Sequence, residues 1–167
     1  MQNRLNYFEH NILPYLPAAY NLARWLTHND QDAEDLVQEA YLRAFKFFDG
    51  FQGQNGRTWL LKIVRNTFYS RLPQKKLQEL TTTFDEETHD QSSEDFNPEK
   101  LMLQNVNNQI LMQALAELPV EYREIIILRE LEYLSYKEIA ELVAIPIGTV
   151  MSRLARARKK LQETLSD

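Results

Sequence analysis

The spacing of apolar residues is the feature that most restricts how this chain can fold. Apolar side chains recur every three or four residues in several separate stretches, which is the period of an α-helix with one buried side. The 167 residues include only 4 glycines and 6 prolines, so an all-β protein would lack most of the turn residues that it requires. The sequence therefore predicts an all-α fold.

The first third of the chain is expected to be a set of helices. Residues 5–28 should form two short helices broken around Pro14 and Pro17. Asp32 is then the expected N-cap of a longer helix, with Glu34 and Asp35 in its first turn, where the helix dipole favours acids. The apolar positions of that helix are Leu36, Val37, Ala40, Tyr41, Ala44, Phe47 and Phe48.

A further helix is expected from about Arg57 to Leu72, ended by Pro73. The glycine- and amide-rich stretch 49–56 before it predicts a loop. The expected buried residues of the helix are Trp59, Leu60, Ile63, Val64 and Phe68. Another side of it carries a basic and aromatic face at positions i, i+3, i+4 and i+7, made of Lys62, Arg65, Asn66 and Tyr69.

The middle of the chain differs in composition from both ends. Residues 79–99 contain many acids among Thr, Ser and Gln, and no lysine or arginine. Such a segment repels itself and cannot pack alone, so it predicts a flexible acidic linker. We therefore expect two small helical domains, 1–77 and 101–167, joined by a linker at 78–100.

The segment 135–160 has the sequence pattern of a helix-turn-helix. Ser135 and Glu138 form an expected capping box, and Pro146 suits the first position of the last helix. That helix should bury one apolar stripe, made of Val150, Leu154, Ala157 and Leu161. Its other side carries Thr149, Ser152, Arg153, Arg156 and Lys160. An apolar stripe opposite a small-polar and basic stripe is typical of a recognition helix in the major groove of DNA.

Positive charge is concentrated in this last helix although the whole chain has a formal net charge of −5. Five cations follow one another without an acid: Arg153, Arg156, Arg158, Lys159 and Lys160. A basic helix end can simply complement the helix dipole, which is worth about 0.3–1 kcal/mol per charge. Together with the capping box and the turn, however, the cluster favours DNA binding, because cations neutralise phosphates.

Three stretches resemble one family in the same order. Residues 117–161 resemble region 4 of the bacterial sigma-70 family, 32–45 (DAEDLVQEAYLRAF) resemble region 2.2, and 57–72 resemble regions 2.3 and 2.4. With only these two domains and a short acidic linker, the chain resembles the extracytoplasmic-function (ECF) group. The resemblance implies a sigma region 2 helical bundle, a region 4 helix-turn-helix, and a factor that binds core RNA polymerase and directs it to the −35 and −10 elements of promoters.

The resemblance also assigns residues to partners. The face that docks on the β′ clamp helices of core polymerase would include Asp32, Asp35, Leu36, Gln38 and Glu39. The residues that hold the melted −10 element would be Gln52, Gln54, Asn55, Arg57, Lys62, Arg65, Asn66, Tyr69 and Arg71. The −35 element would be read by Thr149, Met151, Ser152, Arg153, Arg156 and Lys160. The β subunit of the polymerase and an anti-sigma factor are further partners that the resemblance implies.

Three positions and one short stretch depart from the family pattern. Met151 stands where the family often has lysine, Ala144 where the turn often has glycine, and Ser70 where aspartate is frequent; residues 73–76 are less arginine-rich than usual. These departures bear on promoter preference and leave the class unchanged.

Two other classes of protein fit the sequence less well. A stand-alone helix-turn-helix regulator would need a ligand-binding or phosphoacceptor domain, and residues 1–77 show no βα alternation and no glycine-rich phosphate loop. A helical carboxylate metalloenzyme would need repeated ligand motifs, whereas Glu86-x-x-His89 occurs once, in the acidic stretch. We therefore expect no cofactor, no metal and no enzymatic activity. The lack of cysteine, signal peptide and long apolar run predicts a cytoplasmic protein without membrane insertion, and the family resemblance implies that it is bacterial.

Overall fold

The structure is a computed structural model that describes residues 2–53, 55–73 and 108–166. The described part is helical and contains no strand, so the predicted all-α class is confirmed there. The chain divides into two compact units, Met1–Pro73 and Gln74–Asp167. The stretch expected to be an acidic linker lies outside the described residues.

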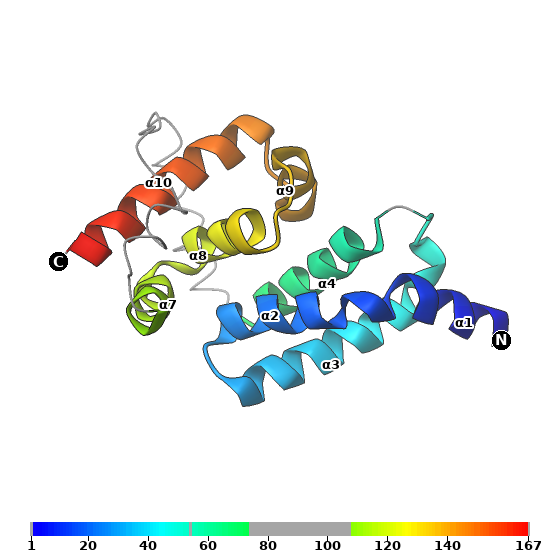
Figure 1. The fold of residues 1–167 in the computed structure, drawn as a ribbon. Helices are drawn as coiled ribbons and strands as arrows, with labels where there is room; N and C mark the ends of the chain where they lie inside the picture. The colour runs from blue at the N-terminus through cyan, green and yellow to red at the C-terminus, as the bar shows by residue number, and fades with distance from the viewer. Residues whose placement is uncertain (1, 54, 74–107, 167) are drawn as a thin grey trace. The chain divides into compact units, whose positions relative to one another are not determined.

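Unit 1 is a bundle in which three helices pack on one another: α2 (Leu16–Thr27), α3 (Asp30–Lys46) and α4 (Gly56–Ser70). Figure 1 shows these helices side by side, with α1 (Gln2–Asn11) leading into the bundle. Two short 3₁₀ turns, Leu13–Tyr15 and Phe48–Gly50, link the elements. Pro14 and Pro17 begin the first of these turns and α2, so the predicted break between the first two helices is confirmed.

The start of α3 differs from the sequence prediction. The N-cap is Asn29 rather than Asp32, and its side-chain oxygen accepts the backbone N–H of Asp32 at 2.8 Å. The Asn29 amide nitrogen in turn donates to the Asp32 carboxylate at 2.7 Å, so the two side chains support one another. The sequence pointed to Asp32 because aspartate and asparagine are both good N-caps. The helix itself begins about one turn before its apolar pattern does.

The buried side of α4 is also rotated from its expected place. Leu60, Leu61, Val64 and Thr67 are buried, whereas Trp59, Ile63 and Phe68 are only half-buried. The helix packs against both α2 and α3, which selects a different stripe from the most apolar one. Thr67 tolerates burial because its hydroxyl donates to the carbonyl of Ile63 at 2.6 Å.

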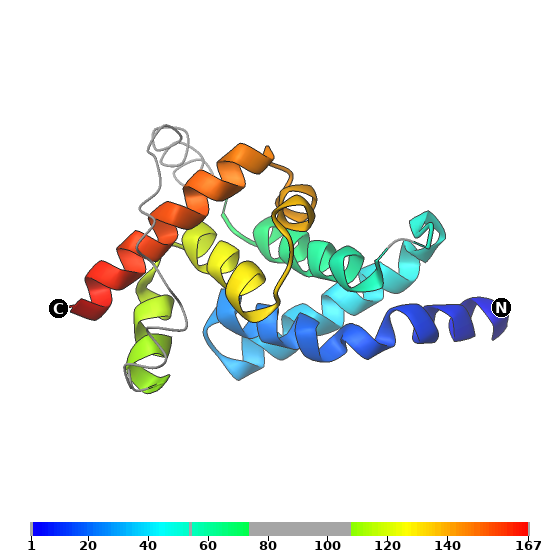
Figure 2. The ribbon, with the colours of Figure 1, turned by 45° about the horizontal axis from the view of Figure 1, so that its top comes forward.

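Unit 2 contains the predicted helix-turn-helix. Its described elements are α7 (Asn108–Glu117), α8 (Val120–Ile126), a π-helical turn at Ile127–Leu131, α9 (Tyr136–Val143) and α10 (Ile147–Ser166). The long helix α10 packs against α7, α8 and α9. Figure 2 shows α10 (orange to red) lying against α8 (yellow). The buried side of α10 consists of Val150, Leu154, Ala157 and Leu161, as predicted, together with Ala155.

Candidate functional surfaces

Local hydrogen bonds fix both the start of α9 and the turn that joins α9 to α10. Ser135 Oγ accepts the backbone N–H of Glu138 at 3.0 Å, and the Glu138 carboxylate accepts that of Ser135 at 2.9 Å, which confirms the predicted capping box. Ala144 ends α9 in the left-handed conformation, with φ 63°. Pro146 lies just before α10 and accepts the N–H of Val150 at 3.1 Å. The turn therefore holds α10 at a defined angle to α9.

The outward side of α10 carries the side chains expected to read DNA. Met151 and Lys160 are exposed, and Thr149, Ser152, Arg153 and Arg156 are half-buried. Ser152 donates to the carbonyl of Thr149 at 3.2 Å, which orients its hydroxyl along the helix. These residues lie on one described surface of unit 2, opposite the apolar stripe.

The five consecutive cations of α10 have different surroundings. Arg158 is held by Glu130 of the π-helical turn, with its Nε 2.8 Å from Oε1 and a second, shorter contact through Nη2. Both side chains are largely buried, so Arg158 joins α10 to the rest of unit 2. Lys160 Nζ lies 5.8 Å from the centroid of the Tyr122 ring, at the edge of cation–π range, and Lys160 remains exposed. The structure therefore separates a structural arginine from a cation accessible to phosphate.

The first turns of α3 form an acidic face on unit 1. Asp32, Asp35 and Gln38 are exposed, whereas Leu36 is fully buried. Leu36 therefore supports this face from the core and has no surface to offer a partner. Glu39 is half-buried and accepts hydrogen bonds from two arginines, Arg43 at 3.4 Å and Arg71 at 2.7 Å.

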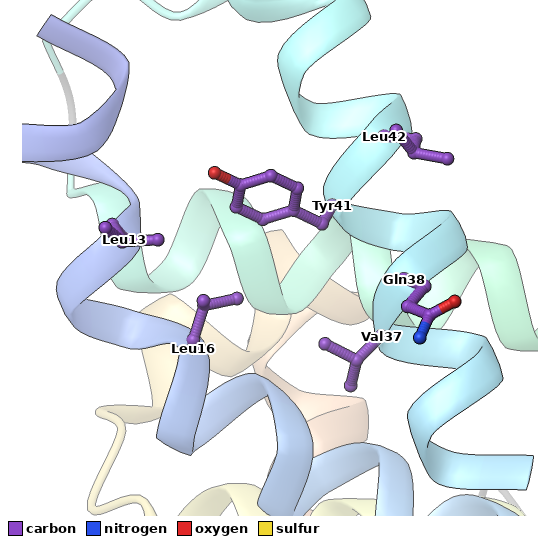
Figure 3. A pocket seen from close by; sticks show the side chains of 6 residues that line it. All are labelled: Leu13, Leu16, Val37, Gln38, Tyr41 and Leu42. Atoms are coloured by element: carbon purple, nitrogen blue, oxygen red, sulfur yellow. The ribbon is translucent and has the colours of Figure 1, made fainter. Parts of the chain in front are cut away.

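An apolar groove lies beside this acidic face. Figure 3 shows Leu13 and Leu16 on one side, facing α3 residues on the other, with Tyr41 pointing toward Leu13. The groove has a volume of about 470 Å³ and is lined by Leu13, Leu16, Val37, Gln38, Tyr41 and Leu42. Burial, with a smaller contribution from Glu9, raises the pKa of the Tyr41 phenol above its usual value. Sequence reasoning missed the groove because Leu13 and Leu42 lie on different elements.

The basic and aromatic face of α4 is accessible. Lys62 and Asn66 are exposed, and Arg65 and Tyr69 are half-buried beside them. The Arg65 guanidinium lies 4.4 Å from the centroid of the Tyr69 ring, a cation–π contact that positions both side chains. Arg57, in the first turn of the same helix, is half-buried. Flat aromatic and guanidinium groups together can stack on a base.

The loop before α4 and the first residue of that helix include both packed and exposed residues. Asn55 is the N-cap of α4 and accepts the N–H of Arg57 at 2.9 Å and of Thr58 at 3.4 Å. A Cβ added at Gly56 would lie 2.2 Å from the carbonyl oxygen of Asn11, so this glycine is required by the close approach of α1. Gln52 is exposed, and Gln54 lies outside the described residues.

The described residues offer no candidate metal site. Within residues 2–53, 55–73 and 108–166, no group of three or more His, Asp or Glu residues is placed to hold a metal. The Glu86-x-x-His89 motif lies outside that part of the chain. The helices of the described residues are also too short or too polar to cross a membrane.

Comparison with known proteins gives matches to both units. Residues 12–77 match the family described as sigma-70 region 2, and residues 108–161 match the family described as sigma-70, region 4. The ECF RNA polymerase sigma-E factor of Escherichia coli K12 is 37% identical over 137 residues, covering 78% of this chain and 72% of the relative. ECF sigma factor SigE of Mycolicibacterium smegmatis is 33% identical over 150 residues, covering 88% of this chain but only 57% of the relative's length.

Solved structures give the same result for the fold. The sigma factor RpoE of Bartonella quintana, solved in complex with the anti-sigma factor NepR, is 32% identical with a TM-score of 0.70, covering 95% of this chain and 96% of that one. CnrH, solved with the cytosolic domain of CnrY, has a TM-score of 0.66 at 22% identity, with 97% and 89% of the two chains covered. This second likeness concerns the fold alone.

Proposed function

Because the chain belongs to the sigma-70 family of RNA polymerase sigma factors, in its ECF group, we propose that its two units bind core polymerase and two elements of a promoter. The observation that carries this proposal is the presence, in one chain and in family order, of a region 2 match at 12–77 and a region 4 match at 108–161. A stand-alone helix-turn-helix regulator would not need the first of these units.

The acidic face of α3 is the proposed surface for core polymerase. Asp35 and Gln38 are exposed there, and the apolar groove continues from Gln38 along the same helix. Acidic side chains beside an apolar groove suit a partner that offers both basic and apolar groups, because complementary charge orients the encounter and apolar burial supplies affinity. We assign this face, by the family resemblance, to the clamp helices of the β′ subunit.

The face of α4 and the loop before it are the proposed site for the −10 element. Lys62 and Arg65 supply positive charge for phosphates, and Tyr69 offers an aromatic surface to an unstacked base. Extruding a base costs a few kcal/mol, which contacts from this face and from the exposed Gln52 would have to recover. Binding energy alone would then open the strands, so the chain itself needs no enzymatic activity.

The outward side of α10 is the proposed reader of the −35 element. Thr149 and Ser152 lie in its first two turns, where a recognition helix meets base edges, and Lys160 lies near its basic end. Arg153 and Arg156 occupy the middle of the same side. We further propose that the protein acts in the bacterial cytoplasm, and that an anti-sigma factor restrains it as NepR binds the Bartonella relative.

Transcription by a reconstituted enzyme tests the proposal. Core RNA polymerase free of sigma factors would be incubated with genomic fragments, with and without the full chain, and the transcript ends would be sequenced. We expect defined start sites only when the chain is present, preceded by two shared sequence elements. Start sites identical to those of core polymerase alone would contradict the proposed function.

A further inference from the structure

The first turns of α10 expose apolar rather than charged side chains. Ile147 is 49% exposed and Met151 is 52% exposed, although both are large hydrophobic residues. They lie four residues apart on a helix and therefore on the same face. The buried stripe of α10 is made by other residues, so packing within unit 2 does not account for this exposed pair.

The glycine between them leaves room beside the helix. Gly148 is exposed, and a Cβ added there would meet nothing within 4 Å. Its φ is not in the left-handed region, so the backbone would accept a side chain. Glycine is unfavourable inside a helix relative to alanine, and the described fold gives no reason for it here. A small residue at an exposed helix start allows close approach of another molecule.

Charge begins only further along the helix. Between Ile147 and Ser152 the sequence has no charged residue, and the first cation of α10 is Arg153. Bidentate recognition of guanine requires arginine or lysine, whereas apolar side chains recognise the C5-methyl group of thymine. The chemistry of these first turns therefore matches thymine.

We propose that Ile147 and Met151 form a thymine-methyl-reading patch of the recognition helix, with Gly148 allowing the helix start to approach the base edges. This inference rests on the proposed function, since it assumes that α10 enters the major groove of the −35 element. It adds the class of base that the helix selects and makes Met151 a specificity-determining residue. It also gives a role to Met151 at a position where the family often has lysine.

Removal of single methyl groups from DNA tests the patch. The probe is the upstream element that the holoenzyme of core polymerase and full chain selects from a random duplex library. Each thymine of that element would be replaced in turn by deoxyuridine, which lacks only the methyl group, and the affinity of the holoenzyme measured. We expect at least one replacement to weaken binding about fourfold, as loss of one buried methyl implies.

Two variants locate the effect. Holoenzyme that carries Met151→Ala should bind the thymine and deoxyuridine probes with equal affinity at one position, because the side chain that contacts the methyl group has been removed. Met112→Ala is the matched control, since Met112 is 51% exposed on α7, and should keep the fourfold difference. A selected element without thymine, or equal binding of every deoxyuridine probe, would overturn the inference while leaving the proposed function intact. Persistence of the difference in both Met151→Ala and Ile147→Ala would overturn it too. Failure to select any upstream element would overturn the proposed function as well.

Discussion

Arg71, at the end of α4, donates from Nε to the Glu39 carboxylate of α3 over 2.7 Å. The same carboxylate accepts from Arg43 at 3.4 Å, so it lies between two guanidinium groups. A residue assigned to promoter DNA and a residue assigned to core polymerase thus bind each other within unit 1. Because both side chains are more than one-third exposed, the pair stabilises the fold by only about 0.2–1 kcal/mol.

This pair changes how the polymerase face is best tested. Glu39→Arg would place three cations together and disturb α4, so loss of binding would have two explanations. Asp35→Arg is the cleaner substitution, since the side chain is exposed and helix propensity is kept. We expect it to weaken binding to core polymerase more than about tenfold, because like charges then meet in the interface.

Glu34→Arg is the matched control for this prediction. Glu34 is exposed next to Asp35 on α3, and one residue of an α-helix turns its side chain by about 100° around the axis. Reversing it changes the helix-dipole interaction in the same way. Fluorescence titration of core polymerase with each labelled variant gives the affinities. If Asp35→Arg binds as tightly as wild type, the assignment of this face is wrong.

Asn55 caps α4, so a role in strand opening has to be distinguished from its effect on stability. Asn55→Ala should lower the free energy of unfolding by about 1 kcal/mol through loss of the cap, whereas Asn55→Ser should keep it. If the amide also contacts an extruded base, both variants should impair strand opening, measured by permanganate footprinting on a native promoter and rescued on one pre-melted by mismatches. Opening at wild-type level by Asn55→Ser would leave Asn55 as a cap only.

The cations of α10 should differ in how they affect DNA binding and stability. Lys160→Ala should weaken promoter binding by the holoenzyme for all sequences and lower the slope of log affinity against log salt by about one. Arg158→Ala should leave that slope unchanged but destabilise the protein by about 1–2 kcal/mol, because Glu130 loses its partner. Equal slopes for wild type and Lys160→Ala would remove the phosphate contact.

The features that sequence alone predicted correctly are local. The capping box at Ser135 and the buried stripe of α10 follow from spacings within one or two helical turns, which a periodic pattern encodes directly. The pairs Arg71–Glu39 and Arg158–Glu130 join residues 32 and 28 positions apart. Such contacts depend on how helices pack, so the pattern of one helix cannot specify them.

The glycines illustrate the same limit. Residues 49–56 were predicted only as a loop, but Gly56 is the first residue of α4 and the space beside it is taken by the backbone of Asn11. Only the packing of α1 against the start of α4 reveals this requirement. Conversely, the turn residue Ala144 was recognised as unusual from the sequence, and its φ of 63° supplies the physical reason.

The left-handed turn at Ala144 predicts a stabilising substitution. A left-handed conformation costs a non-glycine residue about 1–2 kcal/mol. Glycine avoids this cost but increases the conformational entropy of the unfolded chain, which opposes folding by about 0.4–1 kcal/mol. Ala144→Gly should therefore stabilise the protein by about 0.5–1 kcal/mol in urea denaturation. Ala140→Gly, within α9, is the matched control and should destabilise by about 1 kcal/mol. Destabilisation by both changes would contradict this reading of the turn.

We propose above all that this chain is the promoter-directing subunit of a bacterial RNA polymerase. The most direct test of this proposal is retention of core polymerase by the tagged full chain, with core enzyme stripped of other sigma factors and each component quantified. We expect a saturable one-to-one complex that Asp35→Arg weakens and Glu34→Arg does not. A folded chain that retains no core polymerase at micromolar concentration would contradict it.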